Sequence, residues 1–133
     1  MVIYLDTSAV AKLVVEEAES AQLAAWLDSR PDAPLVTSTL TRVELLRAAR
    51  RRGGPTVPRA VALLAELAVV PLGDPVLEAA ALLDPADLRT LAALHTATAA
   101  LLGADLSALV TYDARMAAAA GAAGLPVASP GVR

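Results

Sequence analysis

The first ten residues, MVIYLDTSAV (Met1–Val10), contain the pattern that decides the fold class. Four consecutive apolar residues, Val2 to Leu5, run directly into Asp6. An unbroken apolar run of this length is typical of a strand in a parallel sheet that helices cover on both faces. A negative charge at the end of such a buried strand is energetically tolerable if several carboxylates meet there and bind one cation. The residue after each predicted strand is therefore a candidate functional residue.

The same alternation of apolar runs and helical segments continues along the chain. Further strands are predicted at 33–38, 67–72, 107–112 and 125–129, the last at a sheet edge because it contains Pro126. Helices are predicted at 8–29 (with a break near 16–18), 41–52, 58–67, 75–83, 88–102 and 114–120. Asp74 and Asp87 are interpreted as helix caps. This order predicts a single domain, residues 1–133, that forms a three-layer α/β/α sandwich with a parallel sheet of about five strands.

Composition narrows the possible functions. Apolar residues make up 56% of the 133 residues, which is enough for a packed interior. The formal net charge is −3 and aromatic residues are only 2% of the chain, so nucleic-acid binding through bulk positive charge or stacked aromatic platforms is not expected. Cysteine is absent, which excludes disulfides and thiolate metal sites. Because no signal peptide or membrane-spanning apolar segment is visible, we expect a cytoplasmic protein that does not contact a membrane.

Acidic residues follow the predicted strands at one edge of the sheet. Asp6 follows the first strand, Asp113 follows the strand at 107–112, and Glu44 lies one turn inside the helix after the second strand. In parallel sheets, ligands bind beyond the carboxyl ends of the strands, near the point where the strand order reverses. Three carboxylates that converge there repel one another and require a counter-ion. Since the chain has no cysteine and no histidine pair, these ligands indicate Mg²⁺ or Mn²⁺ rather than zinc.

Each acid also has a simpler interpretation as a helix cap. Asp6 and Asp113 can cap the helices that follow them, and the segment from Thr41 to Glu44 matches a capping box. A single histidine inside a helix, such as His95, is more often a packed or hydrogen-bonded residue than a metal ligand. For each acid taken alone, the sequence leaves both interpretations open.

The arginines also allow two interpretations. Arg50–Arg52 end the predicted helix 41–52, where a basic run can be a solvated helix end stabilised by the helix dipole. The functional interpretation is a phosphate-binding patch close to the acids. Arg42, Arg47 and Arg89 are further candidates for that patch.

Four blocks of the sequence resemble, in order and spacing, the motifs of PIN-domain ribonucleases. The blocks are VIYLDTSAVAKL (2–13), TSTLTRVELLRA (37–48), DLRTLAALHTATAALLGA (87–104) and LVTYDARMAAAAGAAGL (109–125). Over nearly its whole length the chain resembles VapC-type toxins of bacterial toxin–antitoxin pairs. The resemblance implies a PIN-like fold and a Mg²⁺- or Mn²⁺-dependent endoribonuclease of a type II system. The cation in such a site binds a phosphate oxygen and activates a water for attack on the RNA.

By this resemblance, the catalytic and metal-binding residues are Asp6, Glu44 and Asp113. Asp6 is the most central ligand, and the other two orient the water or a second metal ion. The resemblance also implies hydroxyl neighbours for the acids, from Thr111 and from Thr7 or Ser8.

One position departs from the family pattern. The third block usually reads leucine, aspartate, alanine, leucine, histidine, but here Ala92 stands where a metal-binding aspartate is expected. Asp87 lies more than a turn away along the chain, so we do not expect it to substitute. Either this is a natural member that has lost nuclease activity, or the alanine is a deliberate change in a toxic nuclease. We favour the second explanation because every other motif residue remains, and for both we expect weak metal binding and impaired cleavage.

The resemblance also implies partners. The substrate is an RNA, with transfer or ribosomal RNA the commonest choices in the family. A small VapB-like antitoxin is expected to lay its carboxyl-terminal segment across the groove and block the metal site. A homodimer is expected to form through apolar helix surfaces, such as those around Leu13, Trp26 or Leu46.

Other functions of α/β domains fit the sequence less well. A phosphoacceptor receiver domain needs adjacent acids near the first strand and a lysine after a late strand, but Lys12, in the first helix, is the only lysine. A haloacid-dehalogenase-like phosphatase needs a second aspartate two residues after Asp6, where the chain has Ser8. The remaining alternative is a catalytically inactive PIN domain that serves as an RNA- or antitoxin-binding module.

Overall fold

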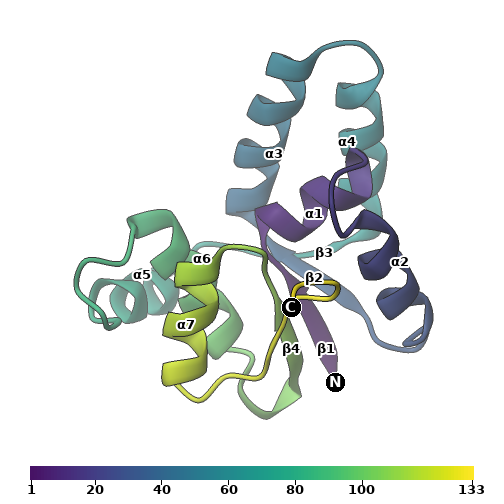
Figure 1. The fold of residues 1–133 in the computed structure, drawn as a ribbon. Coiled ribbons are helices and arrows are strands. Elements are labelled where there is room, and N and C mark those ends of the chain that lie inside the picture. Colours follow the sequence, from purple (N-terminus) through teal and green to yellow (C-terminus); the bar gives the residue numbers. More distant parts are fainter.

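Five parallel strands form the centre of the computed structural model, which describes residues 1–133 (Figure 1). The strands are β1 (Val2–Leu5), β2 (Leu35–Ser38), β3 (Ala68–Val70), β4 (Leu106–Val110) and β5 (Val127–Ala128). Their order in the sheet is β3-β2-β1-β4-β5, and every neighbouring pair is parallel. The prediction of about five parallel strands is confirmed. The position of β5 at an edge is confirmed too, and Pro126, which lacks an amide donor, directly precedes that strand.

Seven α-helices connect and cover the strands. They are α1 (Thr7–Val14), α2 (Ser20–Asp28), α3 (Thr39–Arg52), α4 (Thr56–Glu66), α5 (Asp74–Ala81), α6 (Thr90–Ala100) and α7 (Ala114–Ala122), with a short 3₁₀ turn at Gly103–Asp105. Every predicted helix forms, with ends that shift by up to two residues in most cases, and the break near residues 16–18 separates α1 from α2. None of these helices is long and apolar enough to cross a lipid bilayer.

The predicted caps of two helices are wrong. Helix α5 has Gly73 at its N-cap and α6 has Arg89, and neither helix receives a side-chain hydrogen bond there. Asp74 is instead the first residue of α5. Helix α6 starts two residues later than predicted because the amide of Leu88 bonds the carbonyl of Pro85 in a turn (3.0 Å). Asp87 therefore lies before the helix and does not cap it.

The two faces of the sheet carry separate apolar clusters. Ile3 and Leu5 of β1 pack on one face with residues of α1 to α4, and Tyr4 points to the opposite face with residues of β4, α6 and α7. This alternation follows from the two-residue period of a strand. In Figure 1, α1 to α4 lie on one side of the strands and α5 to α7 on the other. The predicted three-layer arrangement is confirmed.

The strand order reverses between β1 and β4, which lie side by side in the sheet. Strands β2 and β3 follow β1 on one side, and β4 and β5 lie on the other. The carboxyl ends of β1 and β4 therefore form the topological switch point, where open α/β sheets bind their ligands. Asp6 and Thr111 are the residues that directly follow these two strands.

Candidate functional site

The switch point contains a pocket of about 230 Å³. It is lined by residues of α1, α3, α6 and α7 and by the residues that precede α1, α6 and α7: Asp6, Thr7, Ser8, Glu44, Arg89, Leu91, Ala92, His95, Asp113 and Met116. The structure thus brings together the three acids named from the sequence, and Ala92 lies among them. Below, this cavity is called the acid pocket.

Asp6 is at the bottom of the acid pocket and is almost completely buried, with 2% of its surface exposed. Its Oδ1 accepts hydrogen bonds from the Ser8 hydroxyl (2.6 Å) and the Ala9 amide (2.9 Å). Its Oδ2 accepts one from the Thr111 hydroxyl (2.6 Å). Asp6 therefore caps α1 and lines the pocket at once, so the two interpretations of this residue are compatible. Ser8 and Thr111 are the hydroxyl neighbours that were expected.

Burial raises the pKa of the Asp6 carboxyl above its usual value. The hydrogen bonds from Ser8, Thr111 and the Ala9 amide, and the influence of His95, act in the opposite direction, but they do not outweigh the loss of solvation. Burial therefore destabilises the ionised form of Asp6, and a bound cation would offset this destabilisation.

Glu44 does not form the predicted capping box. Ser38 caps α3 instead, by accepting a hydrogen bond from the Leu40 amide (3.0 Å). Since α3 begins at Thr39, Glu44 lies more than a turn from the N-cap and cannot reach back to it as a capping-box residue does. Its side chain points to the acid pocket, where Oε1 accepts a hydrogen bond from the Thr7 hydroxyl (2.6 Å).

His95 supplies the second contact of Glu44. Its Nε2 lies 2.8 Å from Glu44 Oε1, and its Nδ1 lies 2.7 Å from the hydroxyl of Tyr4. Burial alone would raise the pKa of Glu44, but the bonds from His95 and Thr7 and the charge interaction with His95 lower it overall. Glu44 is therefore ionised at neutral pH and can only accept, so Nε2–H donates to it.

Tyr4 completes a buried hydrogen-bonded chain, Tyr4–His95–Glu44. Burial, followed by the charge of Asp6, raises the pKa of the Tyr4 hydroxyl, which therefore stays protonated. In the tautomer that carries its proton on Nε2, the Nδ1 atom of His95 accepts the hydrogen bond from this hydroxyl. The exposed fractions are 0% for Tyr4 and 2% for His95. The interpretation of His95 as a packed, hydrogen-bonded residue is confirmed. Sequence reasoning missed the role of Tyr4, because within an apolar strand its only visible signal was the hydroxyl.

Asp113 lies at the mouth of the acid pocket with an exposed side chain. Its Oδ1 accepts hydrogen bonds from the amides of Arg115 (3.0 Å) and Met116 (3.1 Å), which caps α7. The predicted cap is confirmed, and the residue also lines the pocket.

Ala92 lies in the first turn of α6, 5% exposed, with its side chain on the wall of the acid pocket. Asp87 lines a different cavity, beside α7, and does not take its place. The oxygen donors of the acid pocket suit a hard divalent cation in kind. The number of donors is too small for such a cation, because no three His, Cys, Asp or Glu side chains come close enough together to hold a metal ion.

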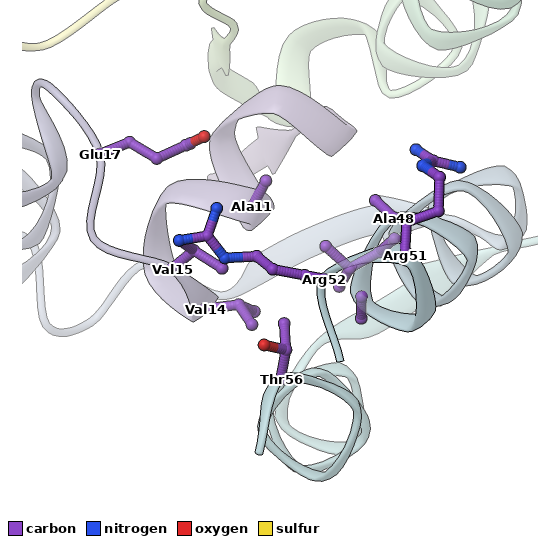
Figure 2. A pocket seen from close by; sticks show the side chains of 10 residues that line it. Ala11, Val14, Val15, Glu17, Ala48, Arg51, Arg52 and Thr56 are labelled. Carbon is purple, nitrogen blue, oxygen red and sulfur yellow. The ribbon is translucent and has the colours of Figure 1, made fainter. Parts of the chain in front are cut away.

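The arginine run at the end of α3 does not reach the acid pocket. Arg51 and Arg52 border a separate cavity of about 350 Å³ between α1 and α3, seen in Figure 2 with Glu17 on its opposite side. Arg51 lies seven positions after Glu44 on α3, a rise of about 10 Å. For this run the structure therefore favours the interpretation as a solvated helix end over a phosphate patch close to the acids. Of the arginines named from the sequence, Arg89 is the one that lines the acid pocket.

The apolar side chains suggested as a dimer surface are largely used inside the fold. Leu13, Trp26 and Leu46 are partly buried and pack against the apolar cluster that α1 to α4 share with β1. Larger exposed apolar surfaces lie on and near α5, where Leu77 is 46% and Leu82 is 85% exposed.

Comparisons with known proteins identify the family. The PIN domain family matches residues 3–122. Ribonuclease VapC47 of Mycobacterium tuberculosis is 44% identical over 132 residues, and the match covers 97% of each chain. Ribonuclease VapC35 of the same species is 48% identical over 136 residues, again with 97% of each chain covered.

Solved structures show the same fold at low sequence identity. Mycobacterium tuberculosis VapC20, described as a Sarcin-Ricin loop cleaving toxin, superposes with a TM-score of 0.71 at 23% identity, covering 98% of both chains. VapBC-1 from nontypeable Haemophilus influenzae gives 0.72 at 16% identity, covering 97% of this chain and 98% of that one. The family match and the full-length relatives lead to one conclusion: the chain belongs to the PIN-domain family, among its VapC-type ribonucleases.

Proposed function

We propose that this chain is an endoribonuclease toxin of a type II toxin–antitoxin system, that its reaction depends on Mg²⁺ or Mn²⁺, and that Ala92 impairs it. The observation that carries the proposal is the acid pocket. Asp6, Glu44 and Asp113 come from three distant segments of the chain and line one cavity at the switch point of the sheet. Asp6 and Asp113 also cap helices, but capping alone does not require all three carboxylates to line the same cavity.

The three acids have distinct proposed roles. Asp6 is the central metal ligand, because its burial makes its charge the one most in need of a cation. Glu44 is held in one orientation by Thr7 and His95, which prepares its carboxylate for a ligand. Asp113, at the mouth, uses Oδ1 for its helix cap and is close to where a substrate enters.

Ala92 accounts for the missing ligand. Its methyl group lies on the wall that the three acids share, so an aspartate there would add a carboxylate to the same cavity. Hard cations need several oxygen ligands, and the acid pocket as it stands provides too few close together. We therefore propose that this chain binds Mg²⁺ or Mn²⁺ weakly and cleaves RNA slowly.

The test compares this chain with Ala92→Asp. We expect the variant to bind Mn²⁺ more tightly by calorimetric titration and to cleave a mixture of transfer and ribosomal RNA, the substrate classes we propose. Ala86→Asp is the matched control, because it adds the same charge at an exposed position just before α6 and outside the acid pocket. If Ala92→Asp gains neither Mn²⁺ affinity nor cleavage over this control, the metal-dependent assignment is wrong.

An alternative function follows from the same alanine. A chain that lacks one ligand can persist as an RNA- or antitoxin-binding module without cleavage. Binding of RNA by Ala92→Asp with Mn²⁺ bound but without cleavage would favour this alternative.

The proposed protein partner is a VapB-like antitoxin, and a homodimer is the proposed assembly. Support for the antitoxin comes from solved structures of the same fold whose descriptions name VapBC assemblies, including VapBC2 from Rickettsia felis bound to a promoter DNA fragment (TM-score 0.72, 12% identity). Co-expression with a VapB-type antitoxin, followed by measurement of the mass of the purified assembly, tests both partners at once. A monomer that emerges without antitoxin would contradict both.

A further inference from the structure

We infer that Arg89 and Arg115 form a phosphate clamp that positions an RNA backbone phosphate next to the acid pocket. The inference rests on the proposed function in so far as RNA is the ligand. It adds to that function two positioning residues that the acid cluster does not include. They bind the substrate in the absence of a metal ion and do not take part in bond breaking.

The clamp surrounds its own cavity. A pocket of about 270 Å³ lies between the starts of α6 and α7 and is lined by Leu88, Arg89, Ala92, Asp113, Ala114 and Arg115. It shares Arg89, Ala92 and Asp113 with the acid pocket, so the two cavities adjoin along one wall. A ligand group held between the arginines is therefore next to the acids. In Figure 1, α6 and α7 lie together on one side of the sheet.

Neither arginine has a partner within the chain. The ion pairs of the structure join Lys12 to Glu17 and Glu19, and His95 to Glu44. No hydrogen bond involves the guanidinium of Arg89 or Arg115, and both residues are exposed. Arg30, by contrast, bonds the carbonyl of Trp26 and stacks on its ring. Two unpaired guanidinium groups at one cavity leave their donors free for an anion.

The surrounding backbone favours an anion as well. Helix α6 begins at Thr90 with Arg89 as its N-cap, and no side chain accepts from its first amides. These amides carry the positive end of the helix dipole. Asp113 is the one acid on the cavity wall, and its Oδ1 is already engaged with two amides of α7. Planar guanidinium groups bind phosphate oxygens in pairs, so the site matches a phosphodiester.

The alanine at position 92, where the family pattern has an aspartate, also affects the clamp. Ala92 lies on the wall between the two cavities and has no charge. A carboxylate there would repel a phosphate when no metal ion is present. The chain as it stands should therefore bind RNA in the absence of metal more tightly than Ala92→Asp does.

The test measures binding of a fluorescent single-stranded RNA oligonucleotide by anisotropy, in EDTA and over a series of salt concentrations. We expect Arg89→Gln and Arg115→Gln each to weaken binding about tenfold, equally for uridine and adenosine oligomers. Each should also make the slope of log affinity against log salt less steep, by the amount that one phosphate contact contributes. Arg89→Lys should recover part of the affinity, because it keeps the charge and loses the paired geometry.

The matched control removes two arginines elsewhere. Arg50 and Arg59 are exposed on α3 and α4 and border neither cavity. Arg50→Gln/Arg59→Gln should change the affinity by less than threefold, whereas Arg89→Gln/Arg115→Gln should nearly abolish binding. Equal losses in both double variants, an unchanged affinity in Arg89→Gln/Arg115→Gln, or no RNA binding by the parent chain would each overturn the clamp. Since no metal or cleavage enters this assay, an Ala92→Asp variant that fails to cleave RNA would contradict the proposed function and leave the clamp standing.

Discussion

Replacing His95 with alanine tests the buried chain Tyr4–His95–Glu44, and we predict that it destabilises the fold strongly. The substitution leaves the fully buried Tyr4 hydroxyl without its 2.7 Å acceptor, a loss of about 1–3 kcal/mol. It also removes the donor to the Glu44 carboxylate, and because the Glu44 side chain is 25% exposed we expect only about 1 kcal/mol from that bond. The cavity left by the ring contributes further. Together these effects predict a decrease of about 3–5 kcal/mol in the free energy of unfolding.

Urea denaturation of the parent chain and the variant measures this decrease. Thr90→Ala, at the exposed start of the same helix, is the control and should change the free energy of unfolding by less than about 0.5 kcal/mol. A double-mutant cycle with Tyr4→Phe should show a coupling energy of about 1 kcal/mol, because the two single variants remove the same hydrogen bond.

A second readout separates the hydrogen-bonded chain from simple packing. Because His95 helps to lower the pKa of Glu44, that pKa should rise in His95→Ala, as followed by NMR of the side-chain carboxyl. A loss of stability below about 1 kcal/mol, or a Glu44 pKa that does not move, would refute the assignment of these contacts.

Three further predictions concern the acids and Ala92. Ala92→Asp should raise the Mn²⁺-dependent rate of RNA cleavage by about a hundredfold, measured under single-turnover conditions, and an increase below about threefold would count against a missing ligand. The pKa of Asp6 is raised in the folded state, so its contribution to stability is present in acid and is lost as the pH rises through that pKa. The difference in unfolding free energy between the parent and Asp6→Asn should therefore fall with rising pH, and a difference that grows would contradict the burial of an ionised Asp6. The pKa of Glu44 is lowered, so the sign is opposite: its contribution is present above the unfolded value of 4.5 and is lost as the pH falls through the folded pKa. Comparison with Glu44→Gln between pH 3 and 7 measures this, and a pH-independent difference would be the contrary result.

Local sequence patterns were sufficient to predict the fold. The strand β1 has four apolar residues in a row and ends at Asp6, which caps the next helix. Turns elsewhere, such as Gly53-Gly54-Pro55, contain glycine and proline, so each element is specified by residues within a few positions of it. The edge position of β5 followed from a single proline. The convergence of Asp6, Glu44 and Asp113 was predictable because parallel strands end at a common edge.

Contacts between distant segments were not predictable in the same way. Tyr4 and His95 are 91 residues apart, and nothing in either segment specifies that the hydroxyl meets the imidazole. The capping box at Glu44 failed because the start of α3 moved to Thr39, two residues earlier than predicted, which shifts every position in the first turn. The positions of the arginines relative to the acids could not be predicted either, because they depend on the direction in which a whole helix leaves the sheet. Charge runs in the sequence gave no indication that Arg89 and Arg115 share a cavity.

The most direct measurement is the anomalous scattering of Mn²⁺ in crystals of Ala92→Asp soaked with the ion. We predict a peak in the acid pocket at coordination distance from Asp6 and from the carboxylate introduced at position 92, with Glu44 or Asp113 among the remaining ligands. A peak elsewhere on the surface, or an empty pocket at saturating Mn²⁺, would contradict the claim that these distant acids are gathered around one cation.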